Sequence, residues 1–420
     1  MSENLILMNA NPVVRALKKM PSEFTKEDII NYIDENGIQM VNFMYPGGDG
    51  RLKTLSFTIN SKEYLDTVLT CGERVDGSSL FSFIQAGSSD LYVLPRFSTA
   101  FRDPFAEIPT LCLLCSFFDK DGEPLASSPE HTLVKATRAF QEVTGMEFHA
   151  MGELEYYVVS VAEEKFPAVD QRGYHESAPF FKTGDFRQRC MHAVAQCGGQ
   201  IKYGHSEVGN FTMEGLCYEQ NEIEFLPVPA VEAADQLMIA KWVIRNKAWR
   251  EGYDVTFSPK IIAGKAGSGL HVHMRIMKDG KNQMIHEGAL SEAARRIGTD
   301  YAIVNSIDGY DEISLTGDFK VATNSYERVF SPSDLGLRKA LPEELVAGAT
   351  EHEAAEIFDA VLENRALQAQ KDIVIANAAF GIQTFERGKK SIEECIAIAR
   401  ESLESGKALA TFKKFREINS

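Results

Sequence analysis

Acidic side chains and histidines recur at alternate positions in several short segments with the composition of β-strands. Residues two apart on a strand point to the same face of a sheet. Carboxylates that converge on one cavity repel one another unless cations lie between them. Such oxygen-rich sites suit Mg²⁺ or Mn²⁺, ions that assist phosphoryl transfer. The residues that could form this site are Glu153, Glu155, Glu207, Glu222 and His271.

Four strand-like segments must position these groups, and they span 151–159, 205–209, 220–225 and 267–273. Segments 129–144, 186–197 and 230–252 have helical periodicity and separate the strands along the chain. Strands interleaved with helices in this way predict an α+β architecture, in which an antiparallel sheet is backed by helices.

The segments on either side of this region have their own patterns. Residues 22–36 are expected to form a helix with Ser22 and Glu23 near its start, and strands 41–45 and 52–59 to form a hairpin. Further on, strands are predicted at 301–307 and 312–315, and helices at 354–364, 368–386 and 391–415. Ser391 and Glu394 form a capping box at the start of the last helix.

Length and charge limit the classes of function. A chain of 420 residues predicts two or three domains, and its net charge of -16 argues against a nucleic-acid or anionic-membrane partner. No apolar run approaches the roughly 18 residues of a membrane helix. Seven scattered cysteines include Cys112 and Cys115 in an apolar run that reads as a buried strand. We therefore expect core thiols and a reducing, cytoplasmic location.

The order of several motifs resembles glutamine synthetase over about residues 1–296. The motifs are Asp76-Gly77-Ser78-Ser79, Glu153-Leu154-Glu155, His205-Ser206-Glu207, Gln220-Asn221-Glu222 and Gly267-Ser268-Gly269-Leu270-His271-Val272-His273. This resemblance implies a small β-grasp-like domain at 1–103 and a partial catalytic domain at 104–296. It also implies a homo-oligomer, because that family builds rings of subunits.

The resemblance further implies which residues hold metal ions. Glu155, Glu207 and Glu222 would hold one divalent cation, Mg²⁺ or Mn²⁺. Glu153 and His271 would supply two of the protein ligands of a second cation.

The same resemblance implies substrates and their sites. ATP would phosphorylate the side-chain carboxylate of glutamate, and ammonia would then displace the phosphate. His273 would lie near the ATP phosphates and Gly267 near the substrate glutamate. Asp76, reaching into the neighbouring subunit, would help bind ammonium and take a proton from it.

Two departures from the family pattern matter, the first for glutamate binding and the second for activity. Ala266 stands where many members have asparagine. A complete glutamine synthetase also continues past the strand of His271 with another metal ligand, a flap glutamate and an Asn-Arg-Ser segment. That continuation is not found here, and Arg328 in Asn324-Ser325-Tyr326-Glu327-Arg328 is a superficial match. We therefore expect an impaired ligase.

Residues from about 297 to 420 resemble the C-terminal part of anthranilate phosphoribosyltransferase. The segments that carry this resemblance are 308–316, Phe330-Ser331-Pro332, Leu335-Gly336-Leu337 and 401–409. Asp311 and Glu312 would then help bind magnesium beside phosphoribosyl pyrophosphate, with anthranilate as the second substrate. The Gly-Thr-Gly-Gly-Asp phosphate loop of that family is absent from this sequence, and backbone N–H groups can crowd a phosphate only in such a glycine-rich loop.

The sequence therefore predicts two truncated enzymes joined near Arg296 and Ile297. A natural gene fusion, an engineered chimera and a reading frame joined in error all fit this pattern. Three functions stay open: a ligase by ancestry, phosphoribosyl transfer to anthranilate, and a non-catalytic oligomeric protein. Each motif alone also has an ordinary structural interpretation, since a Glu-x-Glu pair can face solvent and a single histidine can be a hydrogen-bonded structural residue.

Overall fold

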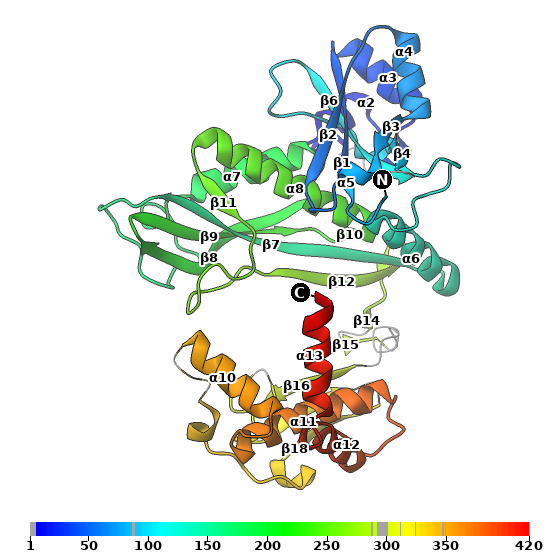
Figure 1. The fold of residues 1–420 in the computed structure, drawn as a ribbon. Helices are drawn as coiled ribbons and strands as arrows, with labels where there is room; N and C mark the ends of the chain where they lie inside the picture. Colours follow the sequence, from blue (N-terminus) through cyan, green and yellow to red (C-terminus); the bar gives the residue numbers. More distant parts are fainter. Residues whose placement is uncertain are drawn as a thin grey trace. The chain divides into compact units, whose positions relative to one another are not determined.

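The computed structural model describes residues 6–85, 89–286, 289–291, 301–310, 312–323, 325–346, 348 and 350–419 (Figure 1). The chain divides into two compact units, Met1–Gln283 and Met284–Ser420, which we call unit 1 and unit 2. The predicted join at residues 296 and 297 lies outside the described residues. Both units mix helices and strands, which confirms the predicted fold class.

Unit 1 begins with a six-stranded sheet in the order β2-β1-β6-β4-β3, with β5 beside β6. The strands are β1 (Met40–Pro46), β2 (Leu52–Thr58), β3 (Glu73–Asp76), β4 (Asp90–Pro95), β5 (Phe101–Arg102) and β6 (Thr110–Phe118). The helices of this part are α2 (Pro12–Leu17), α3 (Lys26–Glu35), α4 (Lys62–Cys71) and α5 (Gly77–Leu80). Strands β1 and β2 form the predicted hairpin, and β1 pairs with β6 in parallel.

Helix α3 begins later than the sequence predicted. Residues Pro21–Glu23 form a separate 3-10 turn, and α3 starts at Lys26. The Thr25 hydroxyl accepts a hydrogen bond from the Asp28 backbone N–H, while the Asp28 carboxylate accepts one from the Thr25 backbone N–H. This complete capping box fixes the helix start, so the predicted start at Ser22 was wrong.

The second sheet of unit 1 has seven strands in the order β13-β12-β7-β9-β8, with β10 and β11 also paired to β7. The strands are β7 (Glu147–Val161), β8 (Ile201–Met213), β9 (Leu216–Phe225), β10 (Val228–Pro229), β11 (Asp254–Thr256), β12 (Leu270–Lys278) and β13 (Lys281–Asn282). The helices are α6 (Pro129–Thr144), α7 (Gly184–Gln196) and α8 (Ala230–Glu251). The strands pair antiparallel and α7 and α8 lie over one face, as predicted (Figure 1).

Alternation along β7 determines which face of this sheet carries the acidic groups. Leu154 and Tyr156 are buried in a core shared with α7 and α8. Glu153 and Glu155 therefore point to the opposite face. The same core contains Met44 of β1, which ties the first sheet to the second within unit 1.

Strand β12 exposes an apolar stripe on its helix side. Leu270 pairs in register with the buried Leu154, so these two side chains share a face. Leu270, Val272 and Met274 are 44%, 52% and 60% exposed. We call these three residues the β12 stripe.

Unit 2 has its own hydrophobic core, in which Phe319, Phe330 and Phe380 pack together. Its strands are β14 (Ile285–His286), β15 (Ala289–Leu290), β16 (Ala302–Ser306), β17 (Phe319–Thr323) and β18 (Glu327–Phe330). Its helices are α10 (Glu351–Leu362), α11 (Gln368–Phe385), α12 (Ile392–Glu404) and α13 (Lys407–Asn419). The first two strands form a pair, and β16-β17-β18 forms a separate antiparallel sheet.

Two predictions for unit 2 were wrong in detail. Residues 312–315 are not a strand; the backbone N–H and C=O of Ile313 instead bond the Asn377 side chain. The predicted helix 391–415 is two helices, because Gly406 has a φ of 80° between α12 and α13. The capping box of Ser391 and Glu394 is confirmed.

All seven cysteines are free, and Cys112 and Cys115 are buried on β6, as predicted. Within the described parts of the chain, every helix is too short or too polar to cross a bilayer.

Candidate metal centre

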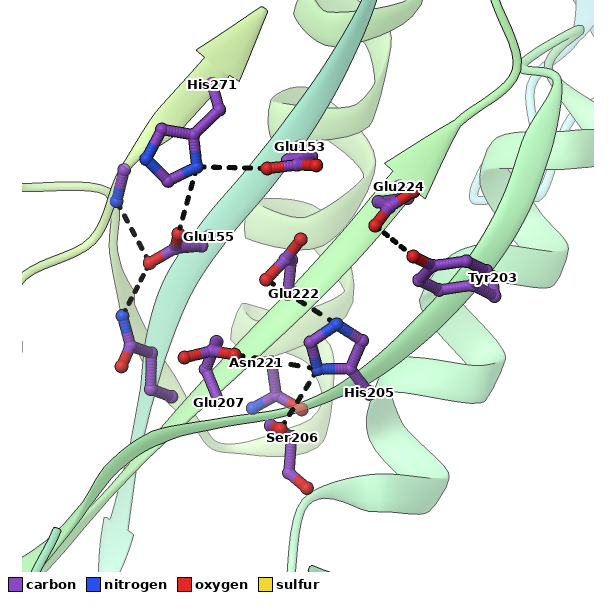
Figure 2. Close-up of polar contacts among 12 residues, drawn as sticks. Glu153, Glu155, Tyr203, His205, Ser206, Glu207, Asn221, Glu222, Glu224 and His271 are labelled. Carbon is purple, nitrogen blue, oxygen red and sulfur yellow. Dashed lines mark hydrogen bonds and ion pairs between the residues drawn. The ribbon is translucent and has the colours of Figure 1, made fainter. Parts of the chain in front are cut away.

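The strand register gathers the predicted metal ligands on the sheet face opposite α7 and α8. Glu155 on β7 lies directly opposite Glu222 on β9, and Glu222 lies opposite His205 on β8. Figure 2 shows these side chains directed toward one another, with Glu207 of β8 beside them. Their carboxylates come from three adjacent strands.

A second row lies two residues along β7. His271 on β12 is opposite Glu153, which in turn is opposite Glu224 on β9. The Nδ1 atom of His271 lies 3.0 Å from Glu153 Oε2 and 3.6 Å from Glu155 Oε1 (Figure 2). The Nε2 atom of His273 lies 2.7 Å from Glu153 Oε1. We call Glu153, Glu155, Glu207, Glu222 and His271 the acidic cluster.

Among the described residues, no lysine or arginine forms an ion pair with the carboxylates of this cluster. Their ion pairs are with histidines alone. His205 Nδ1 lies 3.8 Å from Glu207 Oε1, and His205 Nε2 lies 3.6 Å from Glu222 Oε2. Negative charge therefore accumulates on this face. The groups that face this charge are imidazoles, a side-chain type that also serves as a metal ligand.

Burial and mutual repulsion change how these carboxyl groups titrate. Glu155 is 8% exposed and Glu222 is 6% exposed. Burial, together with the charges of Glu155, Glu153 and Glu207, raises the pKa of Glu222 to about 8. Burial also raises the pKa of Glu155, although the Gly269 backbone N–H opposes that shift. A cation at this position would offset both effects.

Gln220 fixes the position of Glu155 and was missed as a site residue by the sequence analysis. Its Nε2 donates to Glu155 Oε2 at 2.8 Å and to the Gly267 carbonyl at 2.8 Å. Its Oε1 accepts from the Gly209 backbone N–H at 2.9 Å. The signal was available, because Gln220 and Glu222 are two apart on one strand and share a face.

Glu224 continues the same alternation and was also missed. Its carboxylate pairs with the Lys202 ammonium at 2.7 Å and accepts a short hydrogen bond from the Tyr203 hydroxyl (Figure 2). Burial alone would raise the pKa of Glu224, but the bonds from Lys202 and Tyr203 lower it below the usual value. The negative charge of Glu224, beside the cluster, is therefore matched by the Lys202 ammonium. His205, Glu222 and Glu224 each offer one ligand atom, and these atoms lie within 4.8 Å of one another.

The segment before β12 brings backbone groups to the same place. Ser268 N–H bonds the Pro259 carbonyl, and Gly269 N–H donates to Glu155 Oε2 at 3.0 Å. A Cβ atom on Gly267 would lie 2.5 Å from the Pro259 carbonyl oxygen, so this position requires glycine. The carbonyl of Gly267, the predicted substrate residue, accepts a hydrogen bond from Gln220, the residue that also bonds Glu155.

Asp76 lies elsewhere, at the end of β3 in the first sheet of unit 1. It is exposed and caps the short helix α5. The hydroxyls of Ser79 and Ser78 donate to its carboxylate at 2.7 and 2.8 Å. These serine hydrogen bonds hold the pKa of Asp76 well below its usual range.

The two predicted ligands of unit 2 are placed unequally. Asp311 lies outside the described residues, whereas Glu312 is exposed and its carbonyl accepts from the Ser306 hydroxyl at 2.6 Å. Arg328 lies on β18, where its guanidinium stacks 4.6 Å from the centroid of the Phe330 ring. Arg328 therefore belongs to the structure of unit 2.

Three family models match parts of the chain. The glutamine synthetase β-grasp domain matches residues 37–120 and the glutamine synthetase catalytic domain matches 126–334. The glycosyl transferase family a/b domain matches residues 281–409. The last two matches overlap, and strands β16 to β18 of the overlap lie in unit 2.

Individual relatives match either the N-terminal or the C-terminal part of the chain. Glutamine synthetase of Clostridium saccharobutylicum is 31% identical over 271 residues, covering 63% of this chain and 58% of the relative. Anthranilate phosphoribosyltransferase of Phocaeicola vulgatus is 59% identical over 126 residues, covering 30% of this chain and 38% of the relative. The predicted double resemblance is confirmed, and the chain spans only part of each relative.

A solved structure supports the fold. The cryo-EM structure of Plasmodium falciparum glutamine synthetase matches with a TM-score of 0.57 and 20% identity. The match covers 65% of this chain and 58% of that chain. At this identity the likeness concerns the fold alone.

Proposed function

We propose that the acidic cluster of unit 1 binds a divalent cation, Mg²⁺ or Mn²⁺. Glu155, Glu207 and Glu222 are the ligands proposed for one cation, and Glu153 with His271 contributes to a second position. Carboxylate oxygens are the donors that these hard ions prefer. When bound, the ion supplies neutralising charge for a phosphoryl group.

One observation carries this proposal: two almost fully buried carboxylates face each other on neighbouring strands. Glu155 and Glu222 are paired in register, and Glu153 and Glu207 add negative charge beside them. Buried carboxylates without a counter-charge are costly in a folded protein. A cation between these carboxylates would attract each of them and so offset their mutual repulsion.

Isothermal titration with MnCl₂ and MgCl₂ tests metal binding. We expect saturable binding by the parent chain and at least about tenfold weaker binding by Glu222→Gln, because a ligand oxygen becomes a neutral amide. Glu147→Gln is the matched control, since Glu147 lies at the start of β7, the strand of Glu153 and Glu155, and its partner is His149. No heat at millimolar metal with folded protein contradicts the proposal, as does equal binding by both variants.

The second sheet, the acidic cluster and the similarity of unit 1 to glutamine synthetase favour descent from a glutamate–ammonia ligase that uses ATP. We propose that this activity is impaired, because the relatives' match ends after little more than half of their length. Glutamate, ammonia and ATP are then ligands of an incomplete site. His273, held 2.7 Å from Glu153, and the segment around Gly267 are the residues proposed to face ATP and glutamate.

Phosphoribosyl transfer to anthranilate is the second candidate, and it rests on the 59% identity of the C-terminal segment. Its proposed metal residues are Asp311 and Glu312. Because the sequence lacks the glycine-rich phosphate loop, we expect no transfer. Loss of anthranilate fluorescence on adding phosphoribosyl pyrophosphate and Mg²⁺ would contradict this expectation.

A non-catalytic oligomer is the third candidate. We propose self-association through unit 1, with Asp76 near a neighbouring copy, and a reducing cytoplasmic location that fits the seven free cysteines. Size-exclusion chromatography with light scattering tests the assembly. A monomer at micromolar concentration contradicts it.

A further inference from the structure

His205 of β8 faces the acidic cluster with one ring nitrogen already engaged. Its Nδ1 atom lies 3.0 Å from the backbone carbonyl oxygen of Ser206. A carbonyl oxygen can only accept a hydrogen bond, so Nδ1 carries the proton of the neutral ring. The Nε2 atom is then left with a free lone pair. Histidines that bind metal ions almost always have this arrangement, with the other ring nitrogen donating to a carbonyl or carboxylate.

The free lone pair faces a buried carboxylate. His205 Nε2 lies 3.6 Å from Glu222 Oε2 (Figure 2), which is too long for a hydrogen bond. Glu222 is 6% exposed, and within the described residues no hydrogen bond reaches its carboxylate. Two electron-rich atoms that face each other repel unless a positive charge lies between them. Two ligand atoms of one tetrahedral ion, each about 2.1 Å from it, lie about 3.4 Å apart, which is close to this spacing.

Glu224 supplies a third donor at the same place. One ligand atom from each of His205, Glu222 and Glu224 lies within 4.8 Å of the other two. The Glu224 carboxylate is held by the Lys202 ammonium at 2.7 Å and by the Tyr203 hydroxyl. A carboxylate has about four lone-pair positions, so these two bonds leave room for an ion. Hydrogen bonds of this kind also orient the carboxylates that bind metal ions.

The His205 ring is held in place but can be reached from solvent, since its side chain is 15% exposed. The rings of His175, Tyr174 and Tyr203 lie 4.6, 5.4 and 5.9 Å from it between centroids. A cleft of about 670 Å³ is lined by these rings and by the three donor side chains. An ion can therefore enter while the packed rings keep Nε2 directed at Glu222.

We propose that His205, Glu222 and Glu224 bind Zn²⁺ or a chemically similar transition-metal ion through one imidazole nitrogen and two carboxylates. An imidazole nitrogen suits these ions, whereas Mg²⁺ prefers oxygen ligands alone. Three protein ligands leave the fourth position of a tetrahedral ion open to water. This inference rests on the proposed function only in that Glu222 is shared with the cation position of Glu155 and Glu207.

Titration of the full chain with Co²⁺ tests the imidazole ligand, because the visible absorption of Co²⁺ reports its geometry and donors. We expect saturable tetrahedral absorption in the parent chain, which Zn²⁺ abolishes by displacing Co²⁺. His205→Gln should remove this absorption and weaken Zn²⁺ binding at least about tenfold. Mg²⁺ binding, measured by isothermal titration, should change less than about twofold. His192→Gln, at an exposed position of α7, is the matched control and should behave as the parent does.

Circular dichroism establishes that each variant is folded, and Glu224→Gln replaces His205→Gln if the latter does not fold. An octahedral Co²⁺ spectrum overturns the proposal. So does an absorption that His271→Gln removes and His205→Gln leaves, because the ion then lies in the row of Glu153. Binding of Mg²⁺ without Zn²⁺ or Co²⁺ overturns this inference and leaves the proposed function standing. Binding of Zn²⁺ through His205 without Mg²⁺ or Mn²⁺ supports this inference and contradicts the proposed function.

Discussion

Glu155 and Glu222 lie directly opposite each other on strands β7 and β9, and both side chains are almost fully buried. Like charges directly opposite on antiparallel strands destabilise a sheet. The sheet nevertheless places further carboxylates beside this pair. Its stability should therefore depend on whatever neutralises the pair, either protons or a metal ion.

The first prediction concerns pH. Because the pKa of Glu222 is raised to about 8, the folded state binds this proton more tightly than the unfolded chain does. Its contribution to stability is fully present below the ordinary glutamate pKa and is lost as the pH rises toward about 8. Without metal, the melting temperature of unit 1 should fall between pH 5 and pH 8.

Glu222→Gln should flatten this dependence and raise the melting temperature at pH 8, because the amide carries no charge. Saturating Mn²⁺ should restore stability to the parent chain, by about 2.7 kcal/mol at a hundredfold excess over the Kd. Differential scanning fluorimetry from pH 5 to 9, with EDTA or Mn²⁺, measures both effects. Parallel pH profiles for the parent and Glu222→Gln would refute the explanation.

The second prediction concerns Gln220, whose side chain joins Glu155, the Gly267 carbonyl and the Gly209 N–H. Gln220→Met has a similar volume but leaves these groups unpaired. We expect it to lower the free energy of unfolding by about 2–4 kcal/mol in urea titrations. Gln188→Met on the exposed side of α7 is the control and should change stability by less than about 0.5 kcal/mol.

The third prediction concerns catalysis. Phosphate release from ATP with glutamate and ammonia should be at least about 100-fold slower than for a complete glutamine synthetase assayed in parallel, because the chain matches only 58% of such a relative and loss of charge-stabilising groups slows catalysis. Metal binding measured on the same sample separates a competent metal site from a competent active site. Normal turnover would mean that residues of unit 2 supply the missing groups.

The fourth prediction concerns the two units. Each has its own hydrophobic core, so limited proteolysis should yield two resistant fragments that separate between about residues 283 and 297. Mass spectrometry identifies the ends, and the isolated fragments should each show a cooperative melt. Loss of both fragments at the same rate would indicate a single cooperative unit.

Which site residues of one strand lie together was predictable from the sequence, because alternate residues on a strand must share a face. Glu153 with Glu155 follows from that rule alone, as does His271 with His273. The rule does not give the register between strands, so the pairing of Glu155 with Glu222 needed the structure. Glu224 shares the face of Glu222 by the same rule, but its partner Lys202 lies on β8 and only strand pairing brings the two together.

Errors in the predicted elements also have local causes. The start of α3 was placed at Ser22 because serine is a good cap, but Thr25 with Asp28 forms a complete capping box. Residues 391–415 have a continuous helical pattern, so the sequence did not indicate that Gly406 adopts a positive φ and separates α12 from α13. The 312–315 segment has strand-like composition, yet its backbone bonds a side chain of α11.

The β12 stripe has a practical consequence for handling this protein. The stripe exposes three apolar side chains in a row on β12, and the strand beside β12 on one side, β13, has only two residues. This surface can start aggregation between copies of the chain. The surplus of negative charge works against that aggregation only while salt is dilute, since counterions shield it. Purification at low ionic strength should therefore keep the chain in solution, and a high-salt wash should precipitate it.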